Sequence, residues 1–132
     1  MTSLETAGPG PGYKRAPNHR VELSREGKRV RVTFGGETIA DTTNAITIHE
    51  GDYPPVHYIP SGDVRTDLMT PTDNSTHCPF KGDASYWTIN VGGETAENAV
   101  WGYRRPFDEV ADIKDHMAFY PNRVEAISVE DA

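Results

Sequence analysis

The only cysteine of the chain, Cys78, lies in the segment "THCPFKGD" beside two other side chains that can take part in catalysis. A cysteine attacks as the thiolate, and a neighbouring cation lowers its pKa from about 8.5 and so increases the thiolate fraction. His77 and Lys81 are close enough in sequence to do this. Neighbouring side chains of an extended segment point in opposite directions, so another histidine could be the partner instead. Cys78 and His77 are therefore candidate catalytic residues, and the alternative is a buried thiol beside a histidine that fastens a loop.

The same region contains groups that bind ligands. Lys81, followed by a glycine, could pair with a carboxylate or phosphate, although "KGD" is also an ordinary turn before a strand. Asp63 and Arg65 could form a surface ion pair or an arginine clamp for an anion. Tyrosines suit a pocket because their hydroxyl groups need polar partners. The candidate ligand-binding residues are Tyr58, Asp63, Arg65, Lys81, Tyr86 and Tyr120.

The first half of the chain predicts antiparallel strands. "RVRVTF" at residues 29–34 alternates polar and apolar residues, as a half-buried strand does. Gly35 and Gly36 suit a two-residue hairpin, so "ETIADTT" should return antiparallel. "AITIHE" and "VHYIP" predict two further strands, separated by prolines that break the pairing. Residues 61–85 predict a long irregular segment, and ordered loops of that length often carry function.

The second half predicts a hairpin, a helix and a final strand. "SYWTINVGG" and "NAVWGYRRP" should pair, with the aromatic residues Trp87, Trp101 and Tyr103 in the core. "PFDEVADIKDHM" at residues 106–117 has a proline and two acidic residues at its start and apolar residues at helical spacing. "RVEAISVE" predicts the last strand. The fold class expected is mainly β, with two packed antiparallel sheets and one short helix late in the chain.

Length and charge limit the possible functions. The 132 residues suit one domain, and we expect residues 1–20, rich in glycine and proline, to be a flexible tail before a single domain at residues 21–132. The start lacks the apolar core of a signal peptide and one cysteine allows no internal disulfide, so we expect a cytoplasmic location. A net charge of −7 with scattered basic residues argues against nucleic acid and membranes as partners. The five histidines match no ligand spacing, so we expect no metal and no cofactor.

The segments "GGETIADTTNAITIHE", "THCPFKGDASYW" and "WGYRRPFDEVADIKDHMAFYPNRVEAISV" resemble, in order and spacing, the domain-of-unknown-function family 427. The resemblance implies a β-tent-like fold, in which two antiparallel sheets meet at an angle. Many members of that fold group bind a structural zinc through two Cys-x-x-Cys pairs. A chain with one cysteine cannot form that site. The family carries no established activity.

Two hypotheses for function follow from these residues. The first is a module that binds a small polar or anionic metabolite in a pocket beside "HCPFKG". The second is an enzyme that uses Cys78 as nucleophile with a histidine partner.

Overall fold

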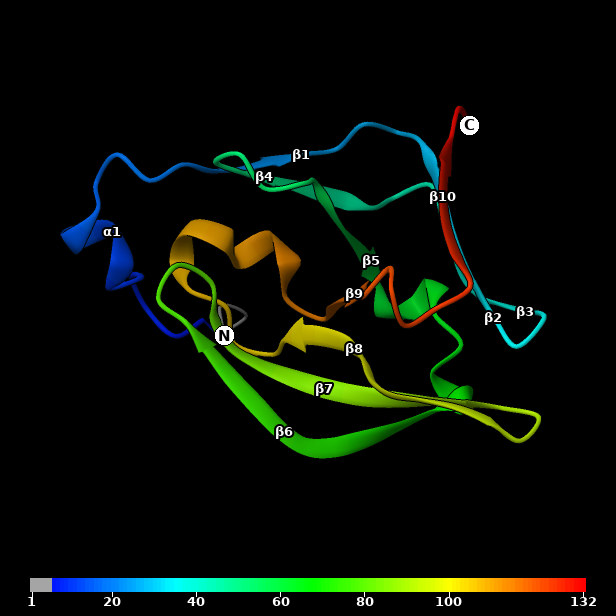
Figure 1. Cartoon of the computed structure of the whole chain (residues 1–132). Helices are drawn as coiled ribbons and strands as arrows, with labels where there is room; N and C mark the ends of the chain where they lie inside the picture. Colours follow the sequence, from blue (N-terminus) through cyan, green and yellow to red (C-terminus); the bar gives the residue numbers. More distant parts are fainter. Residues whose placement is uncertain (1–5) are drawn as a thin grey trace.

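The computed structural model describes residues 6–132, which contain ten strands and four short helical segments (Figure 1). The strands are β1 (Val21–Ser24), β2 (Arg29–Phe34), β3 (Glu37–Thr42), β4 (Ile46–Glu50), β5 (Val56–Pro60), β6 (Met69–Cys78), β7 (Gly82–Val91), β8 (Glu94–Tyr103), β9 (His116–Phe119) and β10 (Ala126–Glu130). The helical segments are α1 (Gly12–Arg15) and the 3-10 turns η1 (Ser61–Asp63), η2 (Thr66–Leu68) and η3 (Asp108–Ile113).

The strands form two antiparallel sheets, as the sequence predicts. The larger sheet has seven strands in the order β1-β4-β5-β9-β8-β7-β6, and the smaller has the order β10-β2-β3. Gly35 and Gly36 have positive φ angles in the turn between β2 and β3, which confirms the predicted hairpin. The predicted pairing of β7 with β8 is also present. The three-stranded sheet lies at one end of the molecule, at a steep angle to β6 and β7 (Figure 1).

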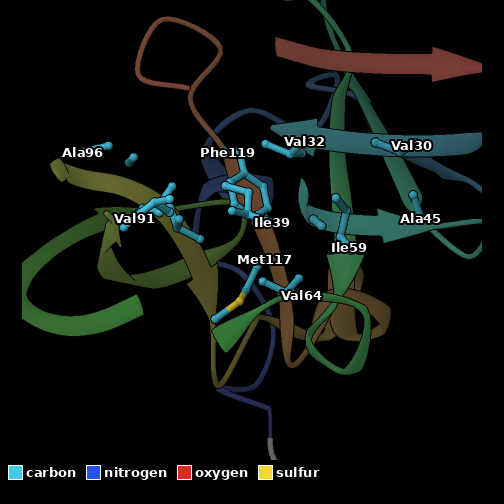
Figure 2. Packing of buried hydrophobic residues seen from close by; sticks show 14 residues of the cluster. Val30, Val32, Ile39, Ala45, Ile59, Val64, Val91, Ala96, Met117 and Phe119 are labelled. Atoms are coloured by element: carbon cyan, nitrogen blue, oxygen red, sulfur yellow. The ribbon is translucent and has the colours of Figure 1, made fainter. Parts of the chain in front are cut away.

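Each face of the large sheet carries its own apolar cluster because neighbouring residues of a strand point to opposite faces. Ile59 and Met117 belong to the cluster that packs against β2 and β3 of the small sheet (Figure 2). Tyr58 and Ala118, their direct neighbours, belong to a second cluster that includes Val110 of η3. The large sheet is therefore covered by the small sheet on one face and by η3 on the other.

The prediction that residues 61–85 form an irregular segment is wrong over most of that range. Residues 69–78 form β6, which pairs with β7 in a long hairpin. β6 is the edge strand of its sheet, and most of its side chains are exposed on both faces, so it lacks the alternation that would identify a strand. Pro71 is tolerated because an edge strand leaves one row of backbone groups unpaired, and the pairing is irregular after it.

The predicted helix at 106–117 is only partly present. The six residues of η3 form 3-10 turns, with a kink at Val110, and β9 begins at His116. Val110 and Ile113 are buried, as the apolar spacing predicts. Asp115 has a φ of 60°, which turns the chain out of the helical path and into β9.

The leader contacts the domain where the structure describes it, and residues 1–5 of the predicted tail lie outside the described range. The Gly12 amide donates to the Pro79 carbonyl at 2.9 Å and the Ala7 amide to the Pro106 carbonyl at 3.0 Å. An alanine Cβ at Gly12 would meet the Phe80 ring at 2.7 Å, so the ring would have to shift to admit one. Among the described residues, no helix has the length and apolar character needed to cross a membrane.

Candidate functional site

The turn between β6 and β7 directs Lys81 into the protein. Cys78 pairs with Gly82 across the end of the hairpin, and the Lys81 amide donates to the Cys78 carbonyl at 3.3 Å. Gly82 has a φ of 128° and a Cβ there would lie 3.2 Å from the Arg105 carbonyl oxygen. Glycine is therefore required at this position. The turn leaves Lys81 with a relative exposure of 9%.

Lys81 forms an ion pair that is nearly buried. Its Nζ lies 2.5 Å from Glu50 Oε1, and the two side chains are 11% and 18% exposed. Glu50 Oε2 contacts His19 Nε2 of the leader at 2.8 Å. Burial alone would raise the pKa of Glu50, but the hydrogen bonds from Lys81 and His19 outweigh it and the pKa is lowered. Glu50 is therefore ionised at neutral pH and balances the charge of Lys81.

Tyrosine hydroxyl groups gather next to this ion pair. The Tyr86 hydroxyl lies 2.8 Å from the Thr76 hydroxyl and 3.4 Å from that of Tyr120. Trp101 Nε1 donates to the Tyr58 hydroxyl at 3.3 Å. Burial, followed by the hydrogen bond to Tyr86, raises the pKa of Tyr120 to about 12, and burial also raises the pKa of Tyr58. These two phenols are thus protonated at neutral pH and can donate hydrogen bonds.

The ion pair and the hydroxyl groups line a hollow of about 260 Å³, here called the tyrosine hollow. A larger space of about 670 Å³, the inter-sheet hollow, adjoins it and shares part of its wall. β2 and β10 form one side of the inter-sheet hollow, and β5, β8 and β9 form the other. The residues common to both hollows are Glu50, Tyr53, Pro54, Val56, Trp101 and Tyr120.

Aromatic rings dominate the shared wall. The rings of Trp101 and Tyr120 lie 4.4 Å apart between centroids, and the Arg123 guanidinium lies 5.0 Å from the Tyr120 centroid. Tyr53, with a relative exposure of 70%, lines the rim of both hollows. An exposed tyrosine beside stacked rings offers a surface on which a flat ligand can lie.

The structure brings together four of the predicted ligand-binding residues and separates the other two. Tyr58, Lys81, Tyr86 and Tyr120 all line the tyrosine hollow. Asp63 instead accepts a hydrogen bond from the Thr42 hydroxyl at 2.7 Å. Arg65 pairs with Asp67 at 2.9 Å on the surface, so the ion pair that the sequence suggested between Asp63 and Arg65 is replaced by one with a different partner.

The two candidate catalytic residues lie in different surroundings. His77 is exposed and its Nδ1 lies 2.7 Å from an Asp83 carboxylate oxygen. It lines a separate depression with Phe107, outside both hollows defined above. The Cys78 thiol is half-buried, and its Sγ lies 3.9 Å from Lys81 Nζ. The cation next to Cys78 is therefore Lys81, whereas the His77 ring bonds to Asp83.

Sequence reasoning missed the contributions of Glu50, Tyr103 and Trp101 to the site. Trp101 and Tyr103 were assigned to the core, and both also line the tyrosine hollow. The register places Trp101 opposite Tyr86, whereas Trp87 lies opposite Val100, so the two tryptophans do not meet on one face. The sequence offered one indication of Glu50, which is the acidic residue at the end of the predicted strand "AITIHE".

Within residues 6–132, no group of three or more histidine, cysteine and acidic side chains is placed to hold a metal ion.

The fold and the hollows define a small β domain of two antiparallel sheets with a mainly apolar cavity between them and a charged, hydroxyl-rich end. A family model described as a domain of unknown function (DUF427) matches residues 22–130, and the chain belongs to this family. This result confirms the resemblance seen in the sequence. No curated protein matches the chain at a significant level.

Proposed function

We propose that the domain binds a small molecule whose apolar or aromatic body occupies the inter-sheet hollow and whose polar end reaches the tyrosine hollow. The observation that carries this proposal is the ion pair of Lys81 and Glu50, which is nearly buried yet forms part of the lining of an open cavity. A buried ion pair contributes little net stability because desolvation offsets the attraction between its charges. A role in recognition accounts for its position better than a role in packing.

The charges of this pair favour a polar end that both donates and accepts hydrogen bonds. Lys81 is already neutralised by Glu50, so a free anion would gain little there without breaking the pair. An amide, a hydroxyl group or a heterocycle could accept from Lys81 or Tyr120 and donate to Glu50. Within the class of polar or anionic ligands, the geometry favours the polar members.

The size and walls of the cavity suit a flat ligand of modest size. The volumes of about 670 Å³ and about 260 Å³ compare with roughly 300–1,000 Å³ for typical small-molecule pockets. The rings of Trp101 and Tyr120 offer stacking surfaces, and Phe119 and Val32 add apolar contacts. A predominantly apolar wall with a few convergent polar groups is typical of ligand sites.

A thiol enzyme is the second candidate, and one observation favours it. Lys81 Nζ lies 3.9 Å from Cys78 Sγ, where an ammonium group would stabilise a thiolate. Alkylation with iodoacetamide over a range of pH distinguishes the candidates. An enzyme nucleophile reacts rapidly near neutral pH and loses this rate in Lys81→Met, whereas a packed thiol reacts slowly in both proteins.

A thermal-shift screen with small aromatic amides and heterocycles tests the binding proposal. We expect some compounds to raise the melting temperature of the wild-type protein and to lose this effect in Lys81→Met. Lys28→Met removes the same charge from an exposed position and is the matched control. Compounds that stabilise wild type, Lys81→Met and Lys28→Met equally, or a screen without any stabilising compound, would contradict the proposal.

A further inference from the structure

A second polar hollow lies on the face of the large sheet opposite to the tyrosine hollow. It has a volume of about 420 Å³ and is called the arginine hollow here. Trp87 and Gly102 line it. Trp87 follows Tyr86, and Gly102 lies between Trp101 and Tyr103, and these three neighbours line the tyrosine hollow. Strand alternation therefore places Trp87 and Gly102 on the opposite face. Its lining residues are Ser61, Trp87, Gly102, Tyr103, Arg104, Arg105, Lys114, Asp115, His116 and Met117.

The absence of a side chain at Gly102 shapes this hollow. A Cβ at Gly102 would lie 2.5 Å from the carbonyl oxygen of His116 and 3.5 Å from the Trp87 ring. The Gly102 backbone therefore lies close to β9, with the Trp87 ring beside it. The His116 ring is fixed because its Nδ1 donates to the Lys114 carbonyl at 2.8 Å.

Two arginines that have no carboxylate partner within residues 6–132 border the hollow. The Arg104 guanidinium lies 5.6 Å from the centroid of the Trp87 ring, and Arg105 donates to the Thr6 carbonyl at 3.1 Å. Among residues 6–132, no ion pair joins either arginine to an acidic group. The nearby carboxylates have other partners, since Asp115 pairs with Lys114 at 2.8 Å and Asp83 with His77 at 2.7 Å.

Acidic residues outnumber Lys and Arg in this chain, twenty against thirteen, yet neither Arg104 nor Arg105 pairs with one among residues 6–132. A guanidinium group presents donors in a fixed fork that matches carboxylate and phosphate oxygens. Contact with the Trp87 ring restrains Arg104 before a ligand arrives, which lowers the entropic cost of binding.

We propose that the arginine hollow binds the oxyanion of a small molecule, a carboxylate or a phosphate group, through Arg104 and Arg105 beside Trp87. This site is separate from the one proposed above, because it shares no lining residue with the inter-sheet hollow and only Tyr103 with the tyrosine hollow, and because it recognises charge.

Nuclear magnetic resonance titrations with sodium phosphate and with sodium acetate, each at constant ionic strength, test the proposal. We expect saturable shifts at millimolar concentration in the amides of residues 102–105 and 114–117, and none in those of β4. Saturation by phosphate, by acetate or by both identifies which oxyanion the hollow accepts. The double variant Arg104→Lys/Arg105→Lys keeps the charge and loses the forks, so its affinity should fall about tenfold.

Arg20→Lys, at an exposed position with a side-chain exposure of 78%, is the matched control and should bind as the wild type does. Amide spectra of the double variant that match wild type outside the hollow establish that it is folded. The proposal is overturned if neither anion gives saturable shifts at residues 102–105 and 114–117, or if the double variant binds as tightly as wild type.

Discussion

Replacing Glu50 by glutamine should destabilise the protein strongly, because it leaves the charge of Lys81 without its counterion. The Lys81 side chain is only 11% exposed and its remaining polar contact is Cys78 Sγ at 3.9 Å, a poor substitute for a carboxylate. Removing one partner of a buried ion pair costs about 3–5 kcal/mol. Since water retains some access to this pair, we expect the lower end, a loss of about 3 kcal/mol in the free energy of unfolding.

Lys81→Met should cost less, about 2 kcal/mol, because Glu50 keeps His19 as a partner and is itself more exposed. The double variant Glu50→Gln/Lys81→Met removes both charges at once. Its loss should therefore be smaller than the sum of the two single losses by about 2 kcal/mol.

Urea unfolding of the four proteins measures this coupling, and circular dichroism gives melting temperatures that should fall by about 10 °C for Glu50→Gln. Asp41→Asn breaks an ion pair with Arg29 whose side chains are 39% and 44% exposed, and it should have little effect. If the losses of the two single variants add within about 0.5 kcal/mol, the charges are not coupled and the reasoning is refuted.

Three further predictions concern pH and packing. The pKa of Glu50 is lowered from 4.5 in the folded state, so the ion pair contributes its full stability above pH 4.5. The difference in unfolding free energy between wild type and Glu50→Gln should therefore close as the pH falls below 4.5. A difference that stays constant with pH would contradict this prediction. Burial lowers the pKa of His57 below 6.5, so protonation of this histidine favours unfolding. In urea titrations, His57→Gln should therefore lose less stability than wild type between pH 7 and pH 5. Parallel curves of unfolding free energy against pH for the two proteins would exclude the effect. Gly102→Ala would place a Cβ 2.5 Å from the His116 carbonyl oxygen and should lower the free energy of unfolding by more than about 2 kcal/mol. Gly62→Ala is the control, because its Cβ meets nothing within 4 Å and the change should be nearly neutral. Equal melting temperatures of the two variants would disprove the steric argument.

The parts of the fold that the sequence predicts correctly are those with a local signal. The alternation in β2, the glycine pair after it and the long β7 to β8 hairpin all depend on residues close together in the chain. β6 escaped detection because an edge strand with two exposed faces has no alternation. The helix expected at residues 106–117 had suitable spacing over barely two turns, and pairing of β9 with β5 and β8 took its last residues.

The candidate site could be predicted only in part for a similar reason. Lys81 and three tyrosines were identified from their chemistry, and they do meet in one hollow. The partner of Lys81 is Glu50, which lies 31 positions earlier in the chain, and no local pattern relates these two positions. Trp101 looked like a core residue because sequence alternation cannot tell a filled interior from the wall of a cavity.

The position of a bound ligand tests the central claim most directly. For a stabilising compound from the thermal-shift screen, isotope-filtered nuclear Overhauser measurements would locate its protons relative to those of the protein. We expect contacts from the ring of the compound to Trp101, Tyr120 and Phe119, and from its polar end to the side chains near Lys81. Contacts confined to surfaces outside the two adjoining hollows would contradict it.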